Sequence, residues 1–301
     1  MTMEAAVAPP PRASVGRRLR RGEGLPYWLI LPTVAYMGIF FVWPMIQAFE
    51  LSVRVGGVWT FSPFRTMYHD IRFGQALHFT LLFIAIIIPV QFVLALTMAL
   101  IANSTIRGRG IFLFLFILPL GASDLAAGLA WSSIFTQHGY LNTILQDLGL
   151  QHVPYIWINP QHQTHLILEI VAAEVWRSTA LITVILIAGL QGIPKEYGEA
   201  AEVFGAGFFR RLWTVTLPML KPAIQVALLL RIVLAFEVFA VVLAIGGQTT
   251  TTLALEAWNW QTMYLNPHVA AAYAALILAL SLLAAAIVIR IFRTRPEQLM
   301  R

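Results

Sequence analysis

The sequence predicts an all-α membrane protein with six transmembrane helices and a cytoplasmic helix-turn-helix between the fourth and fifth spans. Hydrophobic residues make up 59% of the chain and charged residues only 11%, whereas a soluble domain averages about 25% charged residues. The mean hydropathy is +0.76. The apolar residues form six runs long enough to cross a bilayer. The basic residues fall in alternate loops between these runs, which is typical of a multi-pass topology.

The chain begins with a basic, proline-rich segment, residues 1–25, which we expect to be a disordered cytoplasmic tail. A cleaved signal peptide is not favoured, because the next apolar run is too long and no small-residue cleavage site ends it. The transmembrane domain is expected over 26–295, with a short cytoplasmic tail over 296–301. A bilayer needs about 20 mostly apolar residues per span. The six expected spans are 27–50, 79–102, 111–135, 165–190, 222–246 and 269–292.

Basic residues place both termini and two of the loops on the cytoplasmic side. The residues on this side are Arg12, Arg17, Arg18, Arg20, Arg21, Arg107, Arg109, Lys195, Arg210, Arg211, Lys221, Arg290, Arg293, Arg295 and Arg301. The opposite loops contain only Arg54, Arg65 and Arg72. Since cytoplasmic loops carry the excess of Lys and Arg, both ends are expected in the cytoplasm, and the net charge of +6 reports topology rather than nucleic-acid binding.

The number and spacing of the histidine and cysteine residues do not indicate a metal site. The chain has 0 cysteines, which excludes disulfides and thiolate ligands. Its 7 histidines are expected in the outer loops. His162 and His165 are spaced for one helical turn, but no third ligand or acidic partner is evident, so solvated loop histidines are the favoured interpretation. No metal site is expected.

The segment 191–221 is polar between two apolar spans and predicts two short helices. Pro194 ends the fourth span, and helices are expected over 196–203 and 208–216, separated by Gly205 and other turn residues. Composition alone leaves open an amphipathic linker at the membrane surface.

The spacing of residues in this segment resembles the EAA loop of ABC importer permeases. The matching residues are Glu199, Ala200, Ala201, Gly205, Val215, Leu217 and Pro218. In that family the loop docks on a cytoplasmic ATPase subunit and transmits its closure. Small alanines let a helix seat closely on a partner, and the glycine permits a tight bend. Glu199 would supply a charge to the partner or cap its own helix. Phe204 departs from the family, which often has Asp at that position.

The resemblance covers about residues 27–292 and is closest to the carbohydrate-type permeases, including the maltose, trehalose and glycerol-phosphate group. "EVWRST" (174–179) and Leu230-Arg231 are its more specific matches, whereas "GGQT" (246–249) departs from the usual "GGGP". The resemblance implies an importer in a bacterial inner membrane. Its partners would be a second, different permease chain, two copies of an ATPase and an extracytoplasmic solute-binding protein.

The chain itself has no expected ATP site and is not expected to be an enzyme. A phosphate-binding loop ends in Gly-Lys-Ser/Thr, and neither Lys195 nor Lys221 has that context. ATP and Mg²⁺ are therefore expected on the partner ATPase, with no cofactor in this chain.

Charges inside the spans are costly and mark candidate sites. Gly121, Asp124, Gly128 and Trp131 recur at helical spacing, so one face of the third span would offer a carboxylate and an indole to a sugar or polyol. Close helix packing with Asp124 bonded to a neighbouring span is the alternative.

Two further groups of charged residues lie in the fourth and fifth spans. Glu174 and Arg177 are three residues apart and favour a structural ion pair, to which Arg231 could bridge. Glu237, beside Phe236 and Phe239, could line the substrate cavity or form an interhelical bond.

Three other functions are alternatives to a sugar importer. The first is an importer of glycerol-phosphate or polyamine. An anionic substrate would need a cationic cavity, and the carboxylates of Asp124 and Glu237 argue against such a cavity. A stand-alone secondary transporter predicts inverted repeats, which are not evident, and leaves the 191–221 segment unexplained. A membrane-embedded enzyme would need a catalytic constellation at one depth, but the histidines fall in loops.

Overall fold

The computed structural model describes residues 25–104, 108–158, 163–247 and 249–292. In these residues the fold is helical, apart from strands β1 (Arg54–Val55) and β2 (Val58–Trp59), which pair antiparallel. Gly56 and Gly57 form the turn between them, with φ of 60° and 84°. The chain forms two compact units that divide between Leu51 and Ser52.

The first unit is one long apolar helix with a π-helical turn in its middle. Helix α2 (Leu25–Met37) continues through η1 (Gly38–Val42) into α3 (Trp43–Val53). The amide of Trp43 donates to the carbonyl of Gly38, a wider bond than that of an α-helix, and this wider turn directly precedes Pro44, which has no amide hydrogen to donate. The helix is long and apolar enough to cross a membrane, and none of its most apolar stretch is buried.

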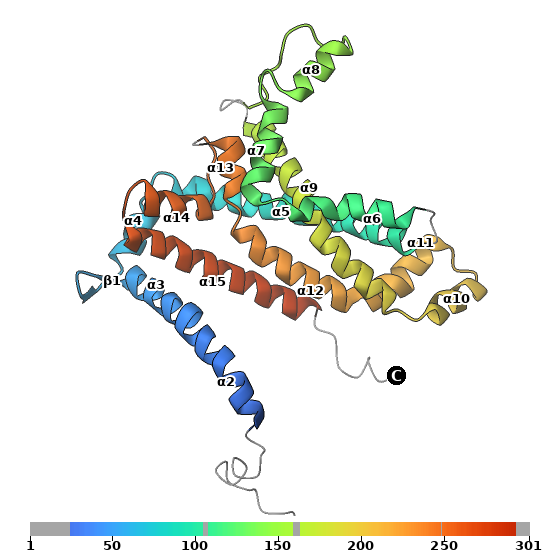
Figure 1. The fold of residues 1–301 in the computed structure, drawn as a ribbon, viewed down its shortest axis with the longest axis horizontal. Coiled ribbons are helices and arrows are strands. Elements are labelled where there is room, and N and C mark those ends of the chain that lie inside the picture. The colour runs from blue at the N-terminus through green and yellow to red at the C-terminus, as the bar shows by residue number, and fades with distance from the viewer. Residues whose placement is uncertain (1–24, 105–107, 159–162, 248, 293–301) are drawn as a thin grey trace, which may run out of the picture. The chain divides into compact units, whose positions relative to one another are not determined.

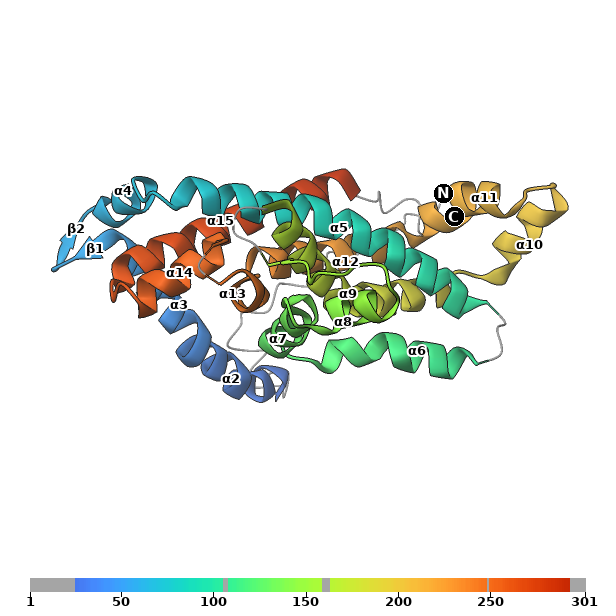
Figure 2. The same ribbon diagram turned by 90° about the horizontal axis from the view of Figure 1, so that it is seen from above.

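The second unit is built on four long helices. They are α5 (Phe73–Asn103), α9 (Gln163–Gln191), α12 (Leu217–Phe236) and α15 (Pro267–Phe292). Helix α9 packs on α5 and α12, and α12 packs on α15, so the four run side by side (Figures 1 and 2). Small residues of α5 such as Ala95 and Ala99 face Ile182 and Leu186 of α9 in one fully buried apolar cluster. One part of the core of the unit therefore lies between α5, α9 and α12.

Short helices occupy the two ends of these long helices. Helices α4 (Ser62–Tyr68) and α14 (Leu253–Thr262) lie at one end, and α10 (Lys195–Val203) and α11 (Phe208–Arg211) lie at the other (Figure 1). At the first end Asp70 accepts hydrogen bonds from the indole of Trp260 at 2.9 Å and the hydroxyl of Tyr273 at 3.0 Å. These bonds fix α14 and α15 to the chain that follows α4.

The expected third span is two helices instead of one. Helix α6 (Arg109–Ile117) and η2 (Leu118–Gly121) are followed by α7 (Asp124–Phe135) and α8 (Tyr140–Asp147), with a bend of 103° at the break. The hydroxyl of Ser123 accepts from the amide of Ala126 and caps the new helix. This corrects the expectation of one continuous helix over 111–135, since a cap here starts α7 in a new direction.

The expected fifth span is also interrupted. Helix α12 ends at Phe236, and α13 (Ala240–Gly246) begins after a break of three residues. The carbonyl of Val238 in the break accepts a hydrogen bond from the hydroxyl of Thr252 at 2.8 Å. A side chain from a later segment thus satisfies a backbone group that the break releases. The apolar helix begins before the expected 222–246 and runs over Phe208–Phe236.

Five helices of the described residues are long and apolar enough to cross a membrane, and the bent pair over 109–147 would make a sixth. The expected all-α membrane fold is therefore confirmed, with five to six spans where the sequence predicted six.

Candidate functional site

The helical hairpin between α9 and α12 is the first candidate site. Helices α10 (Lys195–Val203) and α11 (Phe208–Arg211) form its arms, and the π-helical turn η3 (Leu212–Thr216) leads into α12. The hairpin lies beyond the end of the long helices that is opposite α4 and α14 (Figures 1 and 2).

Gly205 makes the turn between the two arms. Its φ is 76°, in the left-handed region that side chains other than glycine rarely adopt. The amide of Gly205 donates to the carbonyl of Glu202, and the amide of Ala206 donates to that of Ala201, both at 2.9 Å. This is the Schellman pattern that ends a helix. An added Cβ would meet no atom within 4 Å, so the backbone conformation, not space, requires glycine here.

The six residues singled out for this segment occupy different environments. Glu199 and Ala200 are exposed on α10, and Ala201 is half-buried. Leu217 is half-buried and Pro218 exposed in the first turn of α12. Two apolar neighbours at the end of α10 are unusually exposed, Val203 by 85% and Phe204 by 86%. The outer side of the hairpin therefore presents small and apolar side chains together with a carboxylate.

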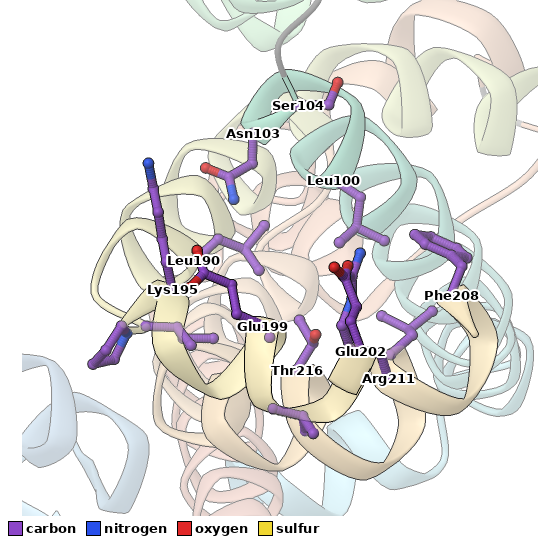
Figure 3. A pocket seen from close by; sticks show the side chains of 15 residues that line it. Leu100, Asn103, Ser104, Leu190, Lys195, Glu199, Glu202, Phe208, Arg211 and Thr216 are labelled. Carbon is purple, nitrogen blue, oxygen red and sulfur yellow. The ribbon is translucent and has the colours of Figure 1, made fainter. Parts of the chain in front are cut away.

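A pocket of about 490 Å³ lies between this hairpin and the end of α5. Figure 3 shows Glu202 and Arg211 on one side of it, and Lys195 and Glu199 on the other. Glu202 and Arg211 form an ion pair. Neither Lys195 nor Glu199 has a side-chain ion pair or hydrogen bond within the described part of the chain.

A buried polar network joins α5, α9 and α12. The guanidinium of Arg231 donates to the carboxylate of Glu174 at 3.0 Å and to the amide oxygen of Gln91 at 2.6 Å. Gln91 in turn donates to the backbone carbonyl of Glu174 at 2.9 Å. The side chains of Arg231 and Glu174 are 1% and 0% exposed, so two opposite charges compensate each other inside the apolar core.

The network extends to α7 through Arg177. Its guanidinium contacts Glu174 at 3.4 Å and Asp124 at 2.8 Å. Asp124 is the first residue of α7, and half of its side chain is exposed. Four charged residues that belong to three different spans therefore lie together in the structure, namely Asp124, Glu174, Arg177 and Arg231.

Of the four residues expected on one face of the third span, Asp124, Gly128 and Trp131 share a face of α7, and Gly121 does not. Gly121 belongs to η2, before the bend, and this corrects the expectation that it lines up with Asp124. Gly128 packs on α13, where an added Cβ would lie 2.7 Å from that of Ala244. Trp131 is half-buried and meets the ring of Trp176 edge-on, with centroids 6.1 Å apart.

The candidate residues of the fifth span lie at its break. Phe236 is buried at the end of α12, Glu237 is exposed, and Phe239 stacks on Trp258 with centroids 5.7 Å apart. They do not reach the Arg231 network through any ion pair or hydrogen bond in the described residues. Glu237 is therefore open to solvent or to another molecule.

Residues 91–300 match the family described as "Binding-protein-dependent transport system inner membrane component". The chain belongs to this family. It is thus the membrane permease of such a transport system, and the predicted membership of the ABC importer permeases is confirmed.

Characterised permeases with similar sequences transport several solutes. The trehalose/maltose transport system permease protein MalF of Thermococcus litoralis is 31% identical over 81% of this chain and 85% of its own length. The sn-glycerol-3-phosphate permease UgpA of Yersinia enterocolitica is 31% identical over 76% and 80%. The trehalose permease SugA of Mycobacterium tuberculosis is 29% identical over 89% and 88%.

A solved structure shares the permease fold. It is a chain of a bacterial ABC transporter involved in the import of the acidic polysaccharide alginate, with a TM-score of 0.80 and 20% sequence identity. The match covers 93% of this permease and 98% of that chain.

Two residues that take part in these sites are not among the candidates that the sequence suggests. Gln91 accepts a hydrogen bond from Arg231, and Trp176 faces Trp131. A lone glutamine in an apolar run was the available signal for Gln91, because a buried amide in a span needs a partner. Trp176 adjoins Arg177, but no periodicity indicates which way its ring points.

Proposed function

We propose that this permease imports a sugar or a related polyol as the membrane-spanning subunit of an ABC importer. Relatives named for trehalose, maltose and sulfoquinovosyl glycerol transport support a carbohydrate. Asp124, which is half-exposed although it pairs with Arg177, and the adjacent indoles of Trp131 and Trp176 support it independently. Sugars offer hydroxyls to carboxylates and an apolar ring face to indoles.

Glycerol-phosphate is the second candidate solute, and relatives named for its transport favour it. Its phosphate would need a cation, but Arg177 is engaged by Asp124 and Glu174. Exposed Glu237 would repel it. A polyamine would suit the carboxylates better, but the relatives reported above are named for sugars and glycerol-phosphate. A stand-alone secondary transporter is disfavoured by the family, whose description includes dependence on a binding protein.

The hairpin over 195–218 would transmit the movement of the ATPase to the spans and so drive transport. The observation that carries this proposal is the turn at Gly205, which holds exposed Ala200, Val203 and Phe204 outward from the spans. Two ATPase subunits, which bind ATP and Mg²⁺, would belong to the transporter, and one of them would bind this surface. Their closure would move α9 and α12, at whose ends the hairpin is fixed, and rock the spans about a central cavity in alternating access.

The assembly would contain a second, different permease chain and an extracytoplasmic binding protein that delivers the solute. Both termini and the hairpin would lie in the cytoplasm of a bacterium, as the positive-inside distribution of Arg and Lys supports. This chain would hold no nucleotide.

Site-directed cross-linking tests this proposal directly. Because the chain has 0 cysteines, a single cysteine placed at Ala200 is its only thiol. We expect Ala200→Cys to cross-link to the ATPase in the assembled transporter, and a cysteine at exposed Tyr140 on α8 to remain unlinked.

Uptake of labelled disaccharide, polyol and glycerol-phosphate into proteoliposomes, with the binding protein and ATP supplied, then identifies the solute class. Absence of any cross-link from residue 200 to an ATPase would refute the hairpin's role, and ATP-independent uptake would favour the stand-alone transporter.

A further inference from the structure

The pocket behind the hairpin changes from apolar to charged across its width. Its floor includes Leu190 of α9, Leu100 of α5 and Ile193, which all belong to the apolar cluster between the long helices. Its opposite side is formed by the charged residues of α10 and by Arg211. The pocket is therefore continuous with the apolar interior of the spans at one side and polar at the other.

The charges of the pocket are only half satisfied within the described residues. Glu202 and Arg211 neutralise each other as an ion pair. Lys195 and Glu199, one helical turn apart on α10, pair neither with each other nor with another described side chain. The amide of Asn103, at the end of α5, also lines the pocket and has no hydrogen-bond partner there. One free cation, one free anion and one free amide thus border the same space.

We propose that this pocket binds a phospholipid of the inner leaflet whose headgroup carries both a phosphate and an ammonium group. The phosphate would bind Lys195 and Asn103, and the ammonium would bind Glu199. The acyl chain would lie toward Leu100 and Leu190. The volume of about 490 Å³ is within the range of about 300–1,000 Å³ that small-molecule sites have.

A bound lipid would connect two parts of the permease that share few other contacts. Arm α10 packs on α11 and η3 of its own hairpin, whereas the end of α5 lies across the pocket. The lipid would bridge α5 to α10 and hold the hairpin at a fixed height at the membrane surface. This inference rests on the proposed cytoplasmic placement of the hairpin but not on its contact with an ATPase.

A glycine in the pocket provides a steric test. Gly198 lines the pocket, and an added Cβ would meet only Arg211 Cδ, at an ordinary contact distance of 3.8 Å. Gly198→Leu should therefore fill the space without straining the helix. Gly207→Leu is the matched control, because Gly207 is in the same hairpin, lies outside the pocket and has open space at its Cβ.

The experiment measures lipid binding by native mass spectrometry on the delipidated, assembled transporter. The probes are phosphatidylethanolamine, phosphatidylglycerol and water-soluble phosphorylethanolamine. We expect Gly198→Leu to weaken phosphatidylethanolamine binding at least tenfold and Gly207→Leu to leave it unchanged. Glu199→Gln should weaken phosphatidylethanolamine but not phosphatidylglycerol, which has no ammonium group. Lys195→Gln should weaken both lipids.

Several results would overturn the proposal. Equal binding of phosphatidylethanolamine by the wild type and Gly198→Leu would exclude the pocket. Equal affinity for phosphorylethanolamine would assign it to a free headgroup-like metabolite instead of a lipid. Lipid binding by the isolated permease that is absent from the assembled transporter would assign the pocket to the ATPase instead. If Gly198→Leu does not assemble, lipid binding is measured instead on the double variant Lys195→Gln with Glu199→Gln, whose two side chains are exposed. Unchanged lipid binding by this double variant would refute the site. Cross-linking at residue 200 reports the ATPase contact separately.

Discussion

Arg231 and Glu174 carry opposite charges inside the apolar core and form an ion pair there. Each would be strongly disfavoured alone in the hydrocarbon region, yet their side chains meet at 3.0 Å with almost no exposure. Gln91 contributes a neutral acceptor to the same guanidinium. Removal of one partner therefore exposes the other to the full cost of an uncompensated buried charge.

Glu174→Gln should destabilise the permease by about 3–5 kcal/mol. The physical reason is that Arg231 loses its anionic partner without gaining access to water. Thermal unfolding of the purified chain in detergent measures the loss.

Replacing both residues with apolar side chains, Glu174→Met with Arg231→Met, should recover most of the stability, since the two opposite charges are removed together and Arg177 keeps Asp124 as its partner. Arg290→Gln at the exposed end of α15 is the control for loss of a charge. A double variant no more stable than the single one would contradict this account.

Gly128 is a second residue whose role is decided by its neighbours. Gly128→Ala should cost about 1–3 kcal/mol by overpacking, because its Cβ would lie 2.7 Å from the Cβ of Ala244 and 3.0 Å from the Cα of Val241. The matched control is Gly110→Ala in α6, where nothing lies within 4 Å. Unfolding midpoints of the two variants in the same detergent compare them, and equal midpoints would argue against tight packing of α7 on α13.

Among the elements, the long helices could be predicted from the sequence and the breaks could not. Apolar runs of about 20 residues indicate a span whatever its neighbours. The same hydropathy continues through the 103° bend before Asp124, so composition does not reveal it. The Ser-Asp pair at 123–124 is a helix-start signal that a continuous apolar pattern obscured. The break after Phe236 depends on Thr252, a distant hydroxyl that no local pattern indicates.

The turn of the hairpin should tolerate no β-branched residue. Gly205→Val places a side chain in a left-handed conformation at roughly 1–2 kcal/mol, so we expect the arms to rearrange and transport to be uncoupled from ATP hydrolysis. Parallel assays of uptake and ATPase activity in proteoliposomes measure this.

Membrane insertion of the spans should be unaffected by that change. Gly207→Val is the control, since the φ of Gly207 is −67°. Normal coupled uptake by Gly205→Val would count heavily against the role of the hairpin.

The segment around α8 depends on one buried amide. The amide group of Asn142 donates to the carbonyls of Gln137 and Tyr155, and its oxygen accepts from Gln151 and Trp157. Asn142→Ala should therefore loosen residues 136–157 while the long helices remain intact. Limited proteolysis from the side that bears α8 should cleave this variant faster, whereas Gln146→Ala, which alters an exposed side chain, should resemble the wild type.

At the scale of the whole molecule, orientation in the membrane is a prediction from charge alone. Because native thiols are absent, single cysteines report the side on which they lie. A cysteine at residue 200 should react with an impermeant maleimide only in inside-out vesicles. A cysteine at exposed Phe61, at the opposite end, should react only in right-side-out vesicles. The reverse pattern would invert the proposed topology.

Long-range pairing limits what the sequence can predict about the sites. The hairpin is local, and its glycine and proline residues were sufficient to place both arms. The contact between Gln91 and Arg231 joins residues 140 positions apart, and their proximity follows only from the packing of α5 on α9 and α12. Glu174 and Arg177 are one helical turn apart, so the sequence predicts that pair. The contact of Arg177 with Asp124 depends on the bend before α7, which the sequence does not predict.

The four linked charges of Asp124, Glu174, Arg177 and Arg231 sum to zero. A transmembrane voltage acts on net charge, at about 2.3 kcal/mol per elementary charge per 100 mV. If the spans rock as proposed, the quartet has no net charge to displace, so its translation as one body does no electrical work. These four residues would then give that step no dependence on the cell's resting potential.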